Sequence, residues 1–345
     1  MIAGYPRFIR KGQVFDLLDV VKGTEAIVCK SDMRKYTSFY ATGVYRGIAT
    51  GYVVGCCFRC FYCWSEWSRD FPEFFGDFYS PNEAYKRILE AAKKWNVRKA
   101  RISGGEPTLC KEHLIKLLGK FEKDNWIELF ILETNGALFG LDPSYVSEIS
   151  KFGKVHVRVS LKAGNPEAFE LRTGVDRSYF EVPFKAIEYL LKSNVSFHVA
   201  AMTDPRIMPK EERAELIERL RKIDTVIAAN LEEEICDPYE TTIVRMQAFG
   251  IDPYRFFTKN VENDSYKREE GDCFLKLFKI ADVEGEDASL RDLYDIAMEE
   301  MPSFLKIYGD LPPRIAIYRI YRNPRYREKV RRAAERFLDE RCKYS

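Results

Sequence analysis

The stretch Gly55-Cys56-Cys57-Phe58-Arg59-Cys60-Phe61-Tyr62-Cys63-Trp64 organises this chain. Three of its cysteines, Cys56, Cys60 and Cys63, stand in a C-x3-C-x2-C frame. One short loop with this spacing can turn three thiolates toward a single centre. Three cysteines leave the fourth iron of a cubane iron–sulfur cluster without a protein ligand, so a small molecule can bind there.

Two other interpretations of the loop stay open at this point. It could hold zinc, with Cys57 or a distant residue as the fourth ligand, because C-x2-C spacing also suits zinc. The cysteines could also be scattered by chance, since two of them are adjacent. The loop alone does not decide among the three.

Length and composition bound the class of protein. The 345 residues fit one large α/β barrel-like domain with additions, or two domains, and the 46% apolar share is ample for a core. A net charge of +2 gives no global field that favours nucleic acid. Neither a signal peptide nor a membrane-length apolar window is visible, so we expect a soluble, cytoplasmic protein with no membrane partner.

The remaining five of the nine cysteines are isolated along the chain. In a cytosolic protein such residues are more often buried thiols than disulfides, so we expect each to act as a small apolar side chain. They are Cys29, Cys110, Cys236, Cys273 and Cys342.

Strand-like and helix-like segments alternate through the middle of the chain. Such alternation predicts right-handed βαβ units and a parallel sheet. The helix that follows the cluster loop begins with Ser80 as its N-cap and Glu83 three residues later. Six strands without a seventh and eighth predict an open, partial barrel; we place them at 51–55, 99–103, 128–133, 155–162, 195–202 and 224–231.

Two flanking regions complete the predicted organisation of the chain. Residues 1–48 form an N-terminal extension over part of the core, with a turn or loop at 37–43. Residues 49–236 form the barrel core, and 237–345 form a helical C-terminal region. Its last helix, near 323–342, is basic; this pattern suits a solvated face or a contact for RNA.

Unusual residues follow four successive predicted strands. The carboxyl ends of parallel strands meet at one edge of the sheet, where chemistry gathers. The first strand leads into the cysteine loop, and the next three end in Gly104-Gly105-Glu106-Pro107, Glu133-Thr134-Asn135-Gly136 and Ser160-Leu161-Lys162. A lone Gly-Gly pair would indicate only a tight turn.

These motifs, in this order and with Tyr62 just before the last cysteine, resemble the radical S-adenosylmethionine (SAM) superfamily over about residues 50–235. The resemblance implies an α/β fold, a partial (β/α)6 TIM-like barrel, and two cofactors: a [4Fe–4S] cluster and SAM. Glu-Thr-Asn-Gly and Ser-Leu-Lys look most like the branch of glycyl-radical-enzyme activases. The long N-terminal lead and helical C-terminal third depart from that branch, so the subfamily stays open.

The resemblance also implies roles for individual residues. Cys56, Cys60 and Cys63 would ligate the cluster. Backbone groups of Gly104 and Gly105 would lie against the methionine part of SAM. The other expected SAM contacts are Glu106, at that segment or the SAM amino group; Glu133 and Asn135, at SAM or substrate; Ser160 and Lys162, at ribose hydroxyls or the SAM carboxylate; and Tyr62, near the adenine.

The implied activity is reductive SAM cleavage under anaerobic conditions, followed by hydrogen abstraction from a protein, peptide or small metabolite. It requires a one-electron donor of the ferredoxin or flavodoxin type and no catalytic side chain. Two alternatives are an RNA-modifying radical SAM enzyme that uses the basic C-terminal helix, and a non-catalytic iron–sulfur or zinc module. Inside the barrel, His156 and Arg158 are expected to bind an anionic substrate or pair with carboxylates, and His198 to be packed rather than to bind metal.

Overall fold

A computed structural model describes residues 5–258 and 313–343. Its core is one sheet with the strand order β1-β2-β3-β5-β6-β7-β8-β9. The last six strands are parallel, as predicted, and the sheet does not close on itself. These strands are β3 (Ile48–Val53), β5 (Lys99–Gly104), β6 (Leu129–Thr134), β7 (Val155–Leu161), β8 (Ser196–Met202) and β9 (Glu232–Glu234). The predicted partial barrel is therefore confirmed.

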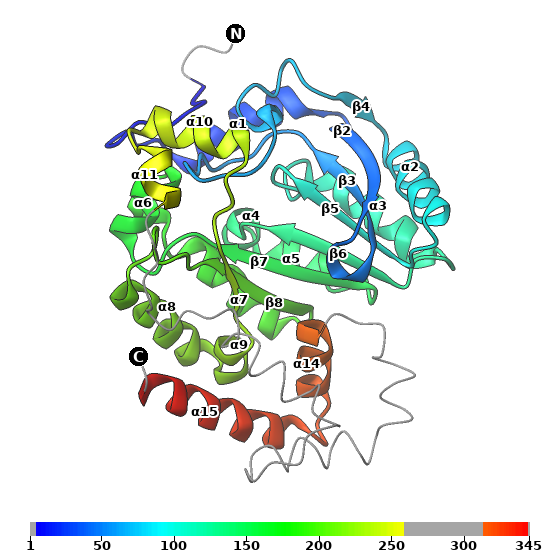
Figure 1. Cartoon of the computed structure of the whole chain (residues 1–345). Helices are drawn as coiled ribbons and strands as arrows, with labels where there is room; N and C mark the ends of the chain where they lie inside the picture. Colours follow the sequence, from blue (N-terminus) through cyan, green and yellow to red (C-terminus); the bar gives the residue numbers. More distant parts are fainter. Residues whose placement is uncertain (1–4, 259–312, 344–345) are drawn as a thin grey trace.

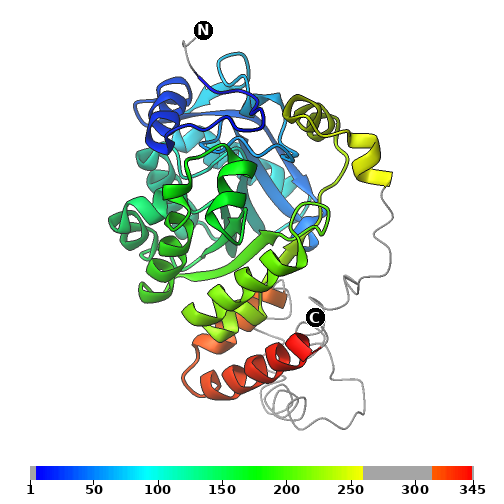
Figure 2. The ribbon, with the colours of Figure 1, turned by 90° about the vertical axis from the view of Figure 1, so that its left-hand side faces the viewer.

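Helices cover the outer face of the sheet (Figures 1 and 2). Polar side chains such as Arg101, Glu133 and Arg158 line a cavity on its inner face. Strand β7 is buried along its whole length. Its valines alternate with His156, Arg158 and Ser160, because successive side chains point to opposite faces of a strand. The covering helices include α2 (Pro81–Lys94), α3 (Lys111–Lys123), α5 (Pro143–Ile149), α7 (Val182–Lys192) and α8 (Lys210–Ile223). Ser80 and Glu83 form the predicted capping box of α2.

The predicted sixth strand at 224–231 is wrong. Asp224 caps a short helix there, α9 (Thr225–Ala229), by accepting hydrogen bonds from the N–H groups of Val226 and Ile227. The strand follows immediately as Glu232–Glu234. Three successive glutamates do not look like a barrel strand in sequence. They form one here because arginines from other elements pair with their carboxylates.

The N-terminal extension adds strands to the sheet. After α1 (Leu17–Val28) and β1 (Cys29–Lys30), strand β2 (Met33–Thr42) pairs antiparallel with β3, and β4 (Asp77–Tyr79) pairs with β2. The predicted turn or loop at 37–43 is therefore wrong. Aromatic pairs support the strand, since the ring of Tyr40 stacks on that of Tyr52 at 4.6 Å between centroids.

The C-terminal region closes the amino ends of the barrel strands. Helix α14 (Pro313–Arg322) places Ile315 in an apolar cluster with Ile48, Leu129 and Ile131. Helix α15 (Arg327–Lys343) packs against α9, at the end of the molecule opposite α1 and α10 (Glu240–Phe249) (Figures 1 and 2). Residues 259–312 of the expected helical region lie outside the described residues, and Cys273 is among them. Every helix in the part of the chain described is too short or too polar to serve as a membrane span.

Candidate active site

One cavity of about 130 Å³ brings the predicted site residues together. It lies where the loops after β3, β5, β6 and β7 meet, at the carboxyl ends of the strands. All eleven predicted site residues line it: Cys56, Cys60, Cys63, Tyr62, Gly104, Gly105, Glu106, Glu133, Asn135, Ser160 and Lys162. Segments more than a hundred residues apart thus converge as the strand-end argument predicted.

The neighbouring Cys57 differs from the three cysteines of the frame. It is fully buried and is not among the residues that line the cavity, and its thiol accepts a hydrogen bond from Asn135 Nδ2 at 3.2 Å. A hydrogen bond from Cys57 lowers the pKa of Cys56 to about 7, whereas burial raises the pKa of Cys60 to about 12. Burial disfavours the thiolate form of these cysteines. Bound iron would favour it, because a thiol that coordinates a metal ion is deprotonated.

Buried arginines hold the backbone of the cluster loop. Arg59 donates to the carbonyl oxygen of Cys56, and Arg69 donates to that of Cys60 at 2.7 Å. Arg245, from α10, donates to the carbonyl oxygen of Cys63 at 2.5 Å. In the same helix, the Thr242 hydroxyl donates to the Cys63 carbonyl oxygen at 3.2 Å. The loop geometry therefore depends on a helix that begins nearly 180 residues later.

Asp70 neutralises two of these arginines. Its carboxylate forms salt bridges with Arg69 and Arg245, and all three side chains are at most 2% exposed. Burial alone would raise the pKa of Asp70, but the two guanidinium groups outweigh burial and lower it. Sequence reasoning missed this group, because only the fold places Arg245 beside Asp70.

The Gly-Gly pair is required by close backbone contacts. Gly104 has φ +98°, a left-handed conformation that favours glycine. A Cβ on Gly105 would lie 2.0 Å from the carbonyl oxygen of Gly55, so no larger residue fits. The N–H groups of Gly105 and Glu106 donate to the carbonyl oxygens of Val53 and Gly55 at 2.9 and 2.8 Å. This segment is thereby fixed to the start of the cluster loop.

Glu106 ties two loops together. Its Oε1 accepts hydrogen bonds from the N–H and hydroxyl groups of Thr108 and from the Thr134 hydroxyl, at 3.0, 2.6 and 2.6 Å. Its Oε2 accepts from the Asn135 N–H at 2.8 Å. The side chain is 2% exposed. Of the two expectations for Glu106, the contacts match support of the glycine segment.

Three other predicted residues make polar contacts with their surroundings. Lys162 Nζ donates to Ser160 Oγ at 2.6 Å, and Ser160 Oγ donates to Glu234 Oε2 at 3.1 Å. Glu133 accepts from Arg101 Nη1 at 2.9 Å and from the Tyr45 hydroxyl at 2.8 Å. Burial would raise the pKa of Glu133, but Arg101 and Arg158 outweigh burial and lower it, so the carboxylate is charged.

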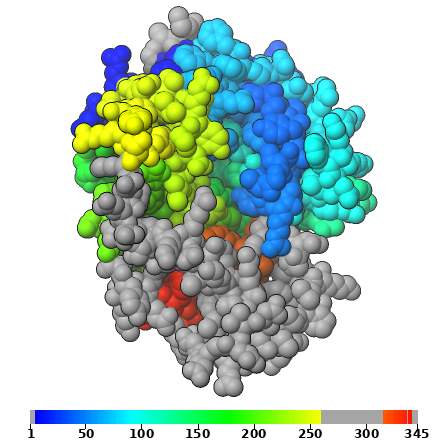
Figure 3. Space-filling view, in the orientation of Figure 1, coloured from blue at the N-terminus to red at the C-terminus, as the bar shows by residue number. Residues whose placement is uncertain are grey.

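A larger cavity of about 840 Å³ adjoins the smaller one. Tyr62, Glu133, Arg158 and Glu234 are among the residues that line both. Strand β2 and the segment after β9 contribute opposite walls; in Figure 3 their blue and yellow-green surfaces face each other across this region. Together the cavities offer room on the scale of a nucleoside-sized cofactor and a second molecule.

The expected interior charges pair with carboxylates. Arg158 binds Glu232 through two hydrogen bonds of 3.0 Å and Glu234 through one of 2.8 Å. His198 Nε2 lies 2.9 Å from Glu232 Oε2, and His198 Nδ1 lies 2.7 Å from His156 Nε2. Burial lowers the pKa of both histidines, so both are neutral. His156 then donates its Nε2–H to His198 Nδ1, and His198 donates its Nε2–H to Glu232. The prediction of a packed His198 agrees with these contacts.

The residues present fit a cluster better than a single ion. Three thiols surround a cavity, and glycines that allow close backbone approach form the facing wall. Within residues 5–258 and 313–343, no three His, Cys, Asp or Glu side chains converge tightly enough to ligate one metal ion. Soft thiolate donors suit iron–sulfur clusters.

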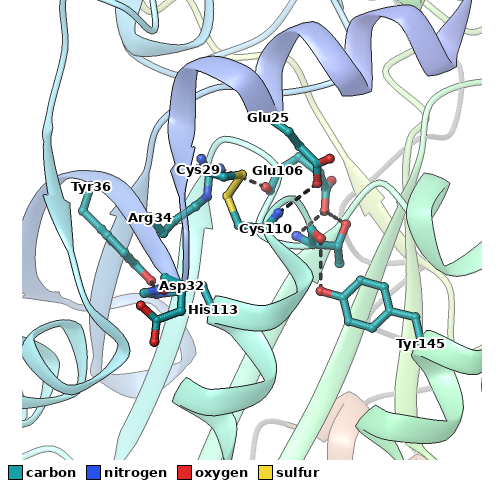
Figure 4. The surroundings of a disulfide bond; sticks show 10 residues. Glu25, Cys29, Asp32, Arg34, Tyr36, Glu106, Cys110, His113 and Tyr145 are labelled. Carbon is teal, nitrogen blue, oxygen red and sulfur yellow. Dashed lines mark hydrogen bonds between the residues drawn. A yellow bond between two sulfur atoms is a disulfide. The ribbon is translucent and has the colours of Figure 1, made fainter.

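Two isolated cysteines correct the expectation of free thiols. Cys29 and Cys110 form a disulfide, with their Cα atoms 5.6 Å apart, within the range a disulfide spans. The bond joins the extension to the end of the segment 104–110, as Figure 4 shows. Their 81-residue separation gave no hint of the pairing. Cys236 is free and buried as expected, and it lines the larger cavity.

Comparisons with known proteins follow the same core. Residues 52–220 match the family model of the radical SAM superfamily. Relatives include a probable GTP 3′,8-cyclase of Thermoplasma volcanium (31% identity over 35% of this chain and 34% of that protein) and one of Methanococcus vannielii (36% identity over 35% and 38%). Another, of Thermococcus kodakarensis, is 26% identical over 57% of this chain and 60% of that protein. The match thus spans about a third of the length of the first two relatives.

Solved structures resemble this chain only at low TM-scores. Native anSMEcpe with bound AdoMet gives a TM-score of 0.41 at 20% identity, over 74% of this chain and 65% of that chain. TYW1 with a lysine–pyruvate adduct bound gives 0.41 at 17% identity, over 55% and 65%. We draw no conclusion about substrates from them. The chain therefore carries a radical SAM domain over residues 52–220, which indicates an enzyme that uses a [4Fe–4S] cluster and SAM.

Proposed function

We propose that this enzyme cleaves SAM reductively and uses the resulting radical to take hydrogen from a substrate in the larger cavity. The observation that carries the proposal is the convergence of the three frame cysteines, the Gly-Gly segment and the strand-end polar residues on one cavity. The adjoining 840 Å³ cavity supports it, because a substrate there would lie next to the cofactor site.

The cysteines would act as the ligands of three irons. Cys56, Cys60 and Cys63 are the cysteines that line the smaller cavity, and buried arginines fix their carbonyl groups. Asn135 Nδ2 lies 3.8 Å from Cys56 Sγ and would orient that sulfur. Hydrogen bonds to ligating sulfurs tune the potential of a cluster.

The remaining wall would bind SAM. Gly104 and Gly105 let the backbone approach the methionine part closely, and Glu106 positions that segment. Ser160 and Lys162 offer a hydroxyl and an ammonium for ribose hydroxyls or the carboxylate. A cluster held by the three cysteines would supply the electron for reductive cleavage of SAM bound beside it. Tyr62 would lie near the adenine, and Glu133 and Asn135 near SAM or substrate.

Substrate and electron donor are further parts of the proposal. The relatives are named as GTP 3′,8-cyclases, and the regions matched cover about a third of the first two, so their substrate does not transfer with the fold. The likeness to glycyl-radical-enzyme activases stays a prediction, as do a ferredoxin or flavodoxin donor and a cytoplasmic location. An RNA contact by α15 also stays a prediction; that helix packs against α9, and Val330 and Leu338 are buried in it.

Anaerobic turnover tests the proposed function. Protein reconstituted with iron and sulfide is reduced with dithionite in the presence of SAM, and 5′-deoxyadenosine is quantified. We expect the wild type and Cys57→Ala to form it, and Cys60→Ala to form none. Production at the level of Cys60→Ala by wild-type protein that carries a full cluster would refute the proposal.

A further inference from the structure

The larger cavity carries a surplus of negative charge. Its described lining holds three arginines and five carboxylates, and burial keeps its one histidine neutral. Three carboxylates have lowered pKa values because neighbouring arginines outweigh their burial, so they are charged near pH 7. The charged residues are Arg101, Arg158, Arg314, Glu66, Glu133, Glu232, Glu234 and Asp237.

Each arginine is already engaged by the protein. Arg101 donates to the Thr50 hydroxyl at 2.8 Å and to Glu133 at 2.9 Å. Arg158 is shared between two glutamates, as described above. Arg314 donates to the carbonyl oxygens of Asn230 and Leu231, both at 2.8 Å. A polyanionic ligand would have to break these contacts to gain a cation.

Two carboxylates of the lining are exposed and make no polar contact through their side chains with the described residues. They belong to Glu66 and Asp237. Exposed aromatic and aliphatic side chains share the cavity lining with them. These are Tyr40, Val44, Trp64, Ile235 and Tyr239, each between 43% and 54% exposed.

Deeper in the cavity, a polar group lacks a partner. The Tyr62 side chain is 5% exposed, and its buried hydroxyl has no hydrogen-bond partner among residues 5–258 and 313–343. The residue stands at the junction of the two cavities. A buried, unpaired hydroxyl costs free energy, so a bound ligand that supplies a partner would gain affinity.

From these observations we infer that the larger cavity takes a substrate that presents a cationic group, such as an amine or guanidinium, rather than a polyanion such as a nucleoside triphosphate. The inference rests on the proposed function, because it concerns the substrate of the same site. The unpaired carboxylates attract a cation, and the exposed aromatic side chains contact it through ring faces. A triphosphate would instead meet five carboxylates and three arginines that the protein already uses.

Binding of charge-matched probes to the SAM-loaded, reconstituted enzyme tests the inference. Spermidine, GTP and guanosine are titrated anaerobically by calorimetry at 50 and 300 mM NaCl. We expect spermidine to bind, its affinity to fall with salt, and GTP to bind no better than guanosine. Neutralising both exposed carboxylates in E66Q/D237N should weaken spermidine binding about 3- to 10-fold, as expected for two exposed ion pairs. E240Q is the control, since Glu240 is exposed outside the cavity lining.

Two outcomes overturn the inference: GTP binding more tightly than spermidine, or spermidine binding that E66Q/D237N and E240Q affect equally. The same samples are assayed for 5′-deoxyadenosine formed without added substrate. Absence of that product refutes the proposed function whatever the binding data. Its presence together with preferential GTP binding refutes only the cationic substrate.

Discussion

Removal of the Cys29–Cys110 disulfide should lower the stability of the fold substantially. The bond closes a segment of 81 residues. Loop-closure entropy for that length corresponds to about 4.5 kcal/mol at 25 °C. With about 2.1 cal/mol/K of unfolding entropy per residue over 345 residues, this free energy corresponds to a fall in Tm of about 6 °C.

The assay compares wild-type apoprotein with Cys29→Ala/Cys110→Ala in guanidinium chloride, each with and without a phosphine reductant. Wild-type protein should lose the stated free energy when reduced, and the variant should not respond. Unfolded without reductant, wild-type protein should expose two thiols fewer than it does after reduction. Thiol counts that are equal, or unfolding curves that coincide, with and without reductant would refute the reasoning.

The bond should also restrain the segment that carries the predicted SAM contacts. Cys110 directly follows Gly104–Leu109, and its N–H donates to Glu25 at 3.1 Å (Figure 4). A second contact also restrains this segment, since Tyr145 OH donates to the Thr108 carbonyl oxygen at 3.0 Å. Reduction should therefore weaken SAM binding, while the iron content, which depends on the other loop, should not change.

Three further perturbations have defined outcomes. Glu106→Gln removes an acceptor from a buried carboxylate that accepts four hydrogen bonds, so SAM binding should weaken at least 10-fold at unchanged iron content; equal SAM affinity by calorimetry would contradict the role of Glu106. Asp70→Asn leaves Arg69 and Arg245 buried without a counter-charge and should cost about 3–5 kcal/mol in urea unfolding, with loss of iron; a change under 1 kcal/mol would show that the pair is not needed. Burial lowers the pKa of His113 to about 4, so below pH 6.5 the unfolded chain binds a proton that the folded chain does not. Stability should fall by about 3 kcal/mol from this group between pH 6.5 and 4, and His113→Gln should flatten the urea midpoint over that range.

The sequence was sufficient for the parallel core and for the residues that meet at its edge. Cys56, Gly105, Asn135 and Lys162 follow different strands, and the geometry of parallel sheets alone brings such strand ends together. The alternation of β7 likewise placed His156 and Arg158 inside the barrel. These inferences work because they depend on period and order, which the sequence carries directly.

Contacts between residues far apart in the chain could not be predicted from the sequence. Nothing marks Arg245 as a partner of Asp70, or Cys29 as a partner of Cys110, because each pair is set by how distant elements pack. Strand β9 was missed since its glutamates are stabilised by arginines such as Arg158 and Arg213 from other elements. Helix α14 was missed because its apolar contacts, through Ile315, lie with the amino ends of barrel strands.

The central claim is that three of the four clustered cysteines, and not the fourth, hold a cluster whose open iron binds SAM. Iron and sulfide per chain, with the electron paramagnetic resonance spectrum of the dithionite-reduced protein, measure this in wild type and in four single alanine variants. The account predicts four irons and a spectrum that shifts on SAM addition in the wild type and Cys57→Ala, and loss of the cluster in Cys56→Ala, Cys60→Ala and Cys63→Ala. A full cluster in any of those three variants, or a spectrum indifferent to SAM, would contradict it.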